Sequence, residues 1–213
     1  MRKYVLATLA LLLPIAASCA DKVLIIGDSI SIGYTPFVQE TLRGIADVEH
    51  SPGNAQDSHN GVQNLDNWIG RERWDVITFN FGLWDICYRL PGPISPENRD
   101  KQRGKQAVPL EQYKENLQAI SKRLKESGAK VIFVTTTYVP DHEPGRFPRD
   151  VAAYNAAAKQ IMQNEGIGVI DLNKTSHALP KSFYESDTDV HYTADGYRAL
   201  AETVTQGIRK ALN

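Results

Sequence analysis

The stretch KVLIIGDSISIGY, residues 22–34, decides the fold class of this chain. Its apolar, β-forming residues run up to Gly27 and then pass through Asp28 and Ser29 into a helical pattern. A strand that leads directly into a helix is the opening unit of an α/β sheet. A hydroxyl on the turn between them lies at the carboxyl edge of the sheet, where such folds place their sites. Ser29 is therefore either a helix cap or a nucleophile.

The rest of the chain continues this alternation of strands and helices. Apolar runs predict buried strands at VLIIG, DVITFNFG, AKVIFVTTTYV and IGVIDL, with ADVEH as a shorter candidate. The clearest helix covers residues 109–127, where apolar side chains recur every three or four positions and Gly128 follows. Strands separated by such helices pair in parallel through right-handed crossovers. We predict one three-layer α/β domain with a five-stranded parallel sheet in the flavodoxin-like order 2-1-3-4-5.

Length and charge limit the classes of protein that the chain can belong to. With 213 residues, 42% of them apolar and 23% charged, it has the size and composition of one soluble globular domain. The formal net charge is -1. Without a basic excess, nucleic acid is not an expected partner.

The first twenty residues differ in character from the remainder. Arg2 and Lys3 precede the apolar run YVLATLALLLPIAAS, which is too short to span a bilayer, and the small residues AASCA close it. This pattern predicts a signal peptide at 1–20 and a mature domain at 21–213, hence an exported protein, periplasmic or secreted, with no membrane span. Alternatively Cys19 becomes the acylated first residue of a membrane-anchored lipoprotein, although Ala16 stands where such a site usually has Leu.

Two long segments match no regular element. Residues 88–109 and 138–150 are rich in proline, glycine and charge, and each follows a predicted strand. Both should therefore overhang the carboxyl edge of the sheet. Loops of this length are either functional or mobile, and for residues 88–109, whose charges are mixed, the sequence leaves solvated loop and substrate contact equally open.

A serine nucleophile needs a base within hydrogen-bond reach and a third group that orients the base. Among the five histidines, His191 stands in DTDVHYTADGY, directly before the last predicted helix, with Asp187 and Asp189 upstream. A nearby carboxylate can accept the Nδ1 proton and leave Nε2 facing the serine. The simpler interpretation is a helix cap, for which Thr193 is the more natural residue.

The stretches IIGDSIS and DVHYTADGY together resemble the SGNH (GDSL-type) hydrolase family. The resemblance covers essentially the whole predicted mature chain. It implies a flavodoxin-like sheet and ester hydrolysis through an acyl-enzyme, with no metal or cofactor. It also implies that Ser29 is the nucleophile and donates its backbone N–H to the oxyanion, and that His191 is the base.

The middle blocks of the family pattern are altered. The third block reads GLWD, with Trp84 where the family has an asparagine that donates to the oxyanion. The indole N–H of Trp84 is a donor that could replace it, Asn80 could reach in from the strand, or Trp84 could form a wall for substrate. The second block, SPGNAQDS, has Gly53 out of the register of the family's glycine, and the backbone N–H of Asn54, Ala55 or Gln56 could serve instead. Losing one oxyanion donor costs about 10²–10³ in rate.

The orienting acid is also displaced from the family position. The family places Asp three residues before His, where this chain has Thr188. We favour Asp189, two residues before His191, because an irregular loop absorbs a one-residue shift. Asp187 is the alternative, and a backbone carbonyl could do the same.

Aromatic and guanidinium groups suggest a substrate class. Trp84, Tyr88 and Arg89 cluster at the third block, and Tyr34 lies near the nucleophile turn. Aromatic faces suit sugar rings and Arg89 suits a uronic acid or sulfate. Packing at the base of the loop is an equal interpretation of the aromatic groups. The predicted function is removal of a small acyl group, acetyl first, from a carbohydrate or related ester. The alternatives are a lysophospholipase or thioesterase of the same fold, and a non-catalytic carbohydrate-binding protein.

Overall fold

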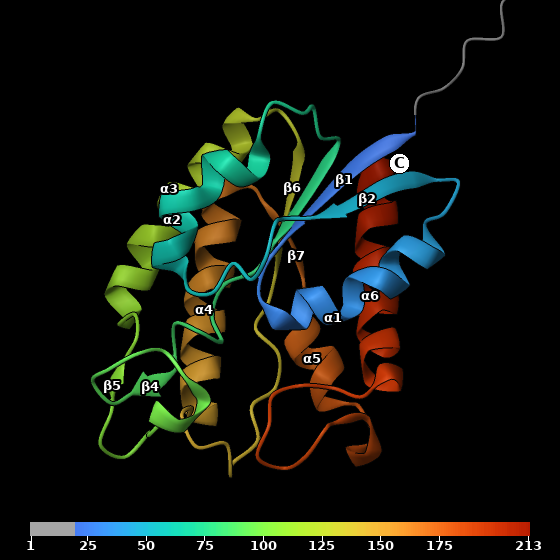
Figure 1. Ribbon diagram of the computed structural model, residues 1–213. Coiled ribbons are helices and arrows are strands. Elements are labelled where there is room, and N and C mark those ends of the chain that lie inside the picture. Colours follow the sequence, from blue (N-terminus) through green and yellow to red (C-terminus); the bar gives the residue numbers. More distant parts are fainter. Residues whose placement is uncertain (1–19) are drawn as a thin grey trace, which may run out of the picture.

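The computed structural model describes residues 20–213 (Figure 1). Five parallel strands form its central sheet in the order β2-β1-β3-β6-β7. They are β1 (Asp21–Ile26), β2 (Ala46–His50), β3 (Val76–Phe79), β6 (Lys130–Val134) and β7 (Gly168–Ile170). This is the predicted order of the five strands. The predicted signal peptide and the possible lipidation of Cys19 fall on residues 1–19, outside the described residues.

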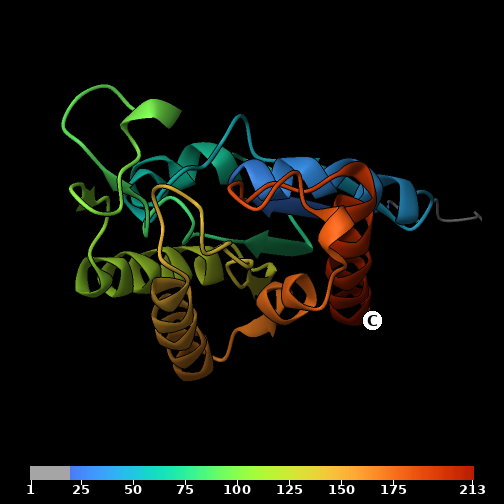
Figure 2. The same cartoon turned by 90° about the horizontal axis from the view of Figure 1, so that it is seen from below.

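Helices cover both faces of the sheet, so the domain has three layers (Figure 2). On one side lie α1 (Ser29–Thr41), α5 (Leu172–His177) and α6 (Ala194–Leu212). On the other lie α2 (Ser58–Ile69), α3 (Leu110–Glu126) and α4 (Pro148–Glu165). The four residues of β3 are all buried, as expected for a central strand that is covered on both faces. The helix predicted at 109–127 is confirmed within one residue at each end, and it buries its apolar stripe.

The long segments gather at the carboxyl edge of the sheet, which is the lower edge in Figure 1. Segment 88–109 contains structure that the sequence did not predict: the antiparallel ribbon of β4 (Tyr88–Arg89) with β5 (Lys105–Gln106), and the short helix η1 (Pro96–Asn98). Backbone hydrogen bonds join this segment to 138–150, from Tyr88 N–H to the Gly145 oxygen (2.7 Å) and from Lys101 N–H to the Pro144 oxygen (2.8 Å). The two segments therefore form one packed unit.

A third segment closes the same edge. It runs from the end of α5 through η2 (Lys181–Phe183) to the start of α6 and carries His191. Tyr184 and Tyr192 form an antiparallel bridge within it, and Thr193 caps α6 by accepting the Gly196 N–H. Within residues 20–213, no helix has the length and apolar character to cross a membrane.

Candidate active site

The turn between β1 and α1 determines what Ser29 can do. Asp28 is the cap of α1: its Oδ1 accepts the Ile30 N–H at 2.9 Å. Ser29 is thus the first helical residue, and its hydroxyl is not needed for capping. The N–H groups of a first helical turn have no partner within the helix, so the backbone of Ser29 offers a donor beside its own Oγ. Gly27 is needed at this turn, because a Cβ there would lie 2.8 Å from Ser31 Oγ.

His191 and Asp189 complete a chain of contacts that begins at Ser29. Ser29 Oγ lies 2.8 Å from His191 Nε2, and His191 Nδ1 lies 2.5 Å from Asp189 Oδ1. The same carboxylate oxygen accepts the His191 backbone N–H at 3.0 Å. Burial tends to raise the pKa of Asp189, but the hydrogen bonds from His191 and the nearby charge of Arg99 hold that pKa below its ordinary value. The structure thus places a hydroxyl, an imidazole and an ionised carboxylate in a line.

Asp187 lies elsewhere. Its side chain is exposed and contributes to a separate cavity of about 530 Å³, together with Tyr138 and His142. The irregular turn over residues 186–189 directs the two aspartates differently, and of these two side chains only that of Asp189 contacts His191.

The candidate oxyanion donors of the second block are already engaged. The Ala55 N–H donates to the Gly27 oxygen at 2.9 Å, which joins this segment to the end of β1. The Gln56 N–H donates to Asn54 Oδ1 at 2.8 Å. Gln56 has φ +56°, a left-handed conformation that favours glycine. Asn54 Oδ1 thus competes with an oxyanion for the Gln56 N–H.

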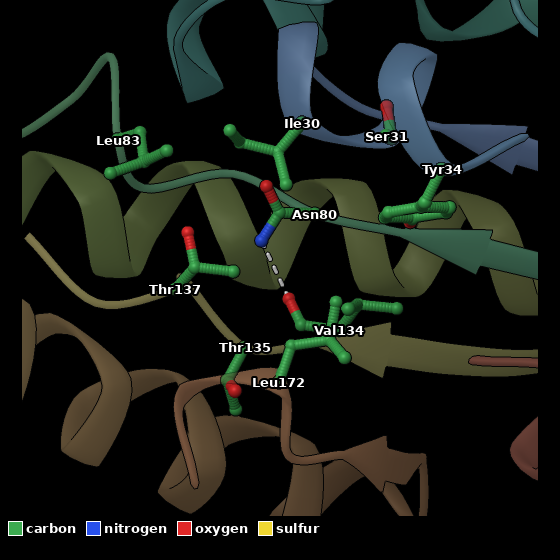
Figure 3. Close-up of a pocket in the computed structure, with 9 residues that line it drawn as sticks. All are labelled: Ile30, Ser31, Tyr34, Asn80, Leu83, Val134, Thr135, Thr137 and Leu172. Atoms are coloured by element: carbon green, nitrogen blue, oxygen red, sulfur yellow. Dashed lines mark hydrogen bonds between the residues drawn. The ribbon is translucent and has the colours of Figure 1, made fainter. Parts of the chain in front are cut away.

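Asn80 and Tyr34 face the interior of the domain. Figure 3 shows the Asn80 amide directed at the backbone oxygen of Val134, to which Nδ2 donates at 2.6 Å. Both side chains line a small cavity of about 10 Å³, which also receives Ser31 from α1. Tyr34 is only 2% exposed. Neither residue reaches the cavity that contains Ser29.

The third block, GLWD, forms a tight turn that presents Trp84. Gly82 has φ +152°, and a Cβ there would lie 1.9 Å from Thr136 Oγ1, so a side chain cannot be accommodated. Asp85 is buried and accepts the Ser58 N–H at 2.9 Å. Burial raises the pKa of Asp85 to about 7. These contacts fix the turn and leave Trp84 half-buried at the cavity wall.

The cavity beside Ser29 has a volume of about 360 Å³. Its wall includes Ser29, His191 and Asp189 together with Trp84 and Arg89. Tyr88, by contrast, packs edge-on against Phe147 with ring centroids 5.4 Å apart and is not part of the wall.

The wall also holds two residues that the sequence analysis did not identify, Arg99 and Arg146. They come from segments 88–109 and 138–150, respectively. Because both segments contain several other charged residues, no pattern in the sequence distinguishes these two.

Comparisons with known proteins identify the family and the fold. Residues 25–199 match the sequence profile of the GDSL-like Lipase/Acylhydrolase family. No curated protein gives a significant match.

Among solved structures, a lipase/acylhydrolase from Enterococcus faecalis superposes with a TM-score of 0.72 and 19% identity, covering 89% of this chain and 96% of its own. An acetyl xylan esterase, AlAXEase, has a TM-score of 0.71 and 16% identity over 88% of this chain and 99% of its own. The acetylxylan esterase Axe2 from Geobacillus stearothermophilus has a TM-score of 0.68 and 19% identity, over 88% and 94%. At these identities the likeness concerns the fold.

Proposed function

Since this chain belongs to the GDSL-like lipase/acylhydrolase family and is a serine ester hydrolase, we propose that Ser29, His191 and Asp189 are its catalytic triad. We further propose that it removes a small acyl group from an exported carbohydrate, with acetyl as the preferred group. The observation that carries the assignment of residues is the continuous contact from Ser29 Oγ through His191 to Asp189, at 2.8 and 2.5 Å. A serine, a histidine base and an orienting carboxylate in this arrangement perform acyl transfer.

The first half of the proposed reaction forms an ester on the enzyme. Ser29 Oγ attacks the carbonyl carbon of the substrate while its proton passes to His191 Nε2. Asp189 accepts the Nδ1 proton in a hydrogen bond and stabilises the imidazolium that results. The tetrahedral intermediate then collapses, the bond to the alcohol breaks, and His191 returns its proton to that alcohol.

The second half restores the enzyme. A water molecule loses a proton to His191 Nε2 and attacks the acyl carbon, and the bond to Ser29 Oγ then breaks as Oγ takes the proton back. The acid leaves and the original hydroxyl is regenerated.

Two donors are proposed for the oxyanion, and a third is available. The Ser29 N–H comes from the first turn of α1, and the Gln56 N–H becomes available if it exchanges its bond to Asn54 Oδ1 for one to the substrate. The indole N–H of Trp84 is the third. Asn80 and Ala55 are left out of the proposal, because their N–H groups donate to Val134 and Gly27.

The substrate class rests on three supports. Two solved structures of this fold are named acetyl xylan esterases. The cavity beside Ser29 holds the indole of Trp84, which suits a sugar ring, and its volume of about 360 Å³ lies in the range of sites that bind small molecules. The sequence of residues 1–20 supports export, either to the periplasm or medium or as a lipoprotein anchored at Cys19.

The nucleophile is tested by labelling with a fluorophosphonate, a reagent that reacts covalently with activated serines. We expect the wild type to be labelled and the Ser29→Ala variant to remain unlabelled. Ser31→Ala is the matched control: Ser31 Oγ also contacts an imidazole, His50 Nε2 at 2.7 Å, but is 2% exposed and lies outside the cavity. Labelling that disappears in Ser31→Ala but persists in Ser29→Ala refutes the assignment, and an unlabelled wild type favours a non-catalytic carbohydrate-binding protein.

The size of the acyl group is tested with 4-nitrophenyl esters from acetyl to octanoyl. We expect kcat/KM to be highest for the acetyl ester and to fall as the chain lengthens. Rates that rise toward octanoyl would instead indicate a lysophospholipase or thioesterase.

A further inference from the structure

Three guanidinium groups gather in the wall of the cavity that contains Ser29. They belong to Arg89, Arg99 and Arg146, and come from two segments far apart in the sequence. The chain as a whole has 24 basic and 25 acidic residues. Three arginines in one cavity of about 360 Å³ are therefore a local concentration, and they share this cavity with the proposed nucleophile.

Each guanidinium is held in place by some of its nitrogens. Arg89 NH1 donates to the Ser95 oxygen (2.9 Å) and Asn98 Oδ1 (3.1 Å), and Arg89 Cζ lies over the Trp84 ring, 5.2 Å from its centroid. Arg99 donates through Nε to the Pro96 oxygen at 3.1 Å. In the part of the chain that the structure describes, NH2 of Arg89 and of Arg99 has no hydrogen bond. Such a nitrogen is preorganised to bind a ligand.

Arg146 is the most deeply placed of the three. Its side chain is 5% exposed, and Nε donates to the Leu83 oxygen at 2.6 Å. Its NH1 donates to Glu143 Oε1 at 2.8 Å, and Arg99 NH1 reaches the same oxygen at 3.0 Å. Within residues 20–213 its NH2, too, is without a hydrogen bond. Arg146 is therefore fixed at the cavity wall and retains donor capacity.

The charges of this wall do not cancel. Glu143 is one carboxylate shared by Arg99 and Arg146, and the partners of Arg89 are a carbonyl and an amide, both neutral. Three positive charges thus face Glu143. Two further acids line the cavity: Asp189 is ionised and bonds to His191, and burial raises the pKa of Asp28. The three arginines therefore outnumber the acids Glu143 and Asp189.

From this arrangement we propose that Arg89, Arg99 and Arg146 form an anion-binding subsite, and that the preferred ester carries a carboxylate on its alcohol part, as an acylated uronic acid does. Guanidinium groups match the planar geometry of a carboxylate and bind it through paired N–H donors. The inference rests on the proposed function and narrows its substrate from carbohydrates in general to acidic ones.

The alternative is that these arginines only fasten the two segments to each other. A purely structural arginine would affect charged and neutral substrates alike when it is replaced. An arginine that binds the substrate would affect the charged one selectively. The discriminating measurement is therefore a ratio between two substrates that differ in one charge.

The experiment compares an acetylated methyl glucuronoside, as the free acid, with its methyl ester, which is the same sugar without the charge. For the wild type we expect kcat/KM to be about tenfold higher for the free acid than for the methyl ester, because charge-assisted hydrogen bonds at a partly exposed site have this magnitude. The difference should lie in KM. Arg99→Gln and Arg89→Gln should each remove most of this preference, because each should reduce kcat/KM on the free acid by more than on the methyl ester.

Arg103→Gln is the matched control. Arg103 lies in the same segment, its side chain is 75% exposed, and it is outside the cavity wall. Replacing it removes the same charge from the protein, so the preference for the free acid should remain. Equal rates on the two substrates in the wild type, or an equal loss on both in Arg99→Gln, would overturn the inference while leaving the esterase proposal intact.

Binding provides a test that does not depend on hydrolysis. Ser29→Ala protein is titrated with both sugars by calorimetry, and we expect the free acid to bind about tenfold more tightly than the methyl ester. Equal affinity for both would overturn the subsite. If the wild type hydrolyses neither sugar while the Ser29→Ala protein binds the free acid selectively, the result would instead overturn the esterase proposal and retain the subsite.

Discussion

Replacing Asp189 by Asn tests how His191 is oriented. The side-chain shape is retained, and the Asn oxygen can still accept the His191 backbone N–H that Asp189 Oδ1 accepts at 3.0 Å. What changes is the contact with His191 Nδ1, which in the wild type is 2.5 Å long and charge-assisted. If the amide instead turns its N–H toward Nδ1, it gives up the backbone hydrogen bond, because Oδ1 makes both contacts. It then forces the other tautomer, in which Nε2 carries the proton and cannot accept one from Ser29.

The expected cost follows from these two effects. A hydrogen bond to a charged group contributes about 1.5–3 kcal/mol, and the lower part of this range applies because the Asp189 side chain is 40% exposed. The wrong tautomer raises the loss further, and in other triads it reaches about 10⁴ in kcat. We expect kcat/KM on 4-nitrophenyl acetate to fall by roughly 10²–10³.

Asp187→Asn provides the control. It removes the same charge at a position two residues before Asp189, and the Asp187 side chain does not contact His191. It should change kcat/KM by less than about twofold, as expected for an exposed surface substitution. Circular dichroism verifies that both variants are folded. A loss of equal size in the two variants, or a loss below about threefold in Asp189→Asn, would refute the assignment of the orienting acid.

Two further predictions concern stability. Gln56→Gly should raise the free energy of unfolding by about 0.5–1 kcal/mol, because Gln56 sits at φ +56°, where a non-glycine residue costs about 1–2 kcal/mol; urea unfolding that shows destabilisation would contradict this strain argument. Burial lowers the pKa of His50 in the folded protein, so below pH about 6.5 the unfolded chain binds more protons at His50 than the folded protein does. The contribution of neutral His50 to stability is therefore fully present above that pH and is lost as the pH falls. Unfolding free energies at pH 5 and pH 8 should reveal this slope, and His50→Gln should reduce it; an unchanged slope would contradict the role of His50.

The fold was predictable because its signals are local and repeated. The run up to Gly27 has the composition of a buried strand, and residues 109–127 have a helical period, so both elements could be read directly. The order of the strands followed from their alternation with helices. The β4–β5 ribbon was missed because each of its strands has only two residues, too few to show a period.

The candidate site was partly predictable. Ser29 and His191 stand in recognisable contexts, and the structure brings their side chains into contact. Which aspartate contacts His191 depends on the path of an irregular turn, and an irregular turn has no period to read. Likewise Tyr34 resembled a substrate contact only because it is near Ser29 in sequence, whereas α1 carries it into the core. Arg146 reaches the cavity through tertiary contacts alone.

The buried carboxylate of Glu143 makes segments 88–109 and 138–150 interdependent. It is 0% exposed, and its partners are Arg99 in the first segment and Arg146 in the second. Grafting segment 88–109 alone, from a relative without an arginine at position 99, would remove one of the two cations that pair with Glu143. Grafting 138–150 alone, from a relative without the glutamate, would leave Arg99 without its carboxylate. Either change should cost less than the about 3–5 kcal/mol of a fully buried pair, because Arg99 is 20% exposed and Arg146 stays with Glu143. Natural variation and protein engineering should therefore exchange these segments as a pair, so that new specificities in this scaffold come from coordinated changes on both sides of the cleft.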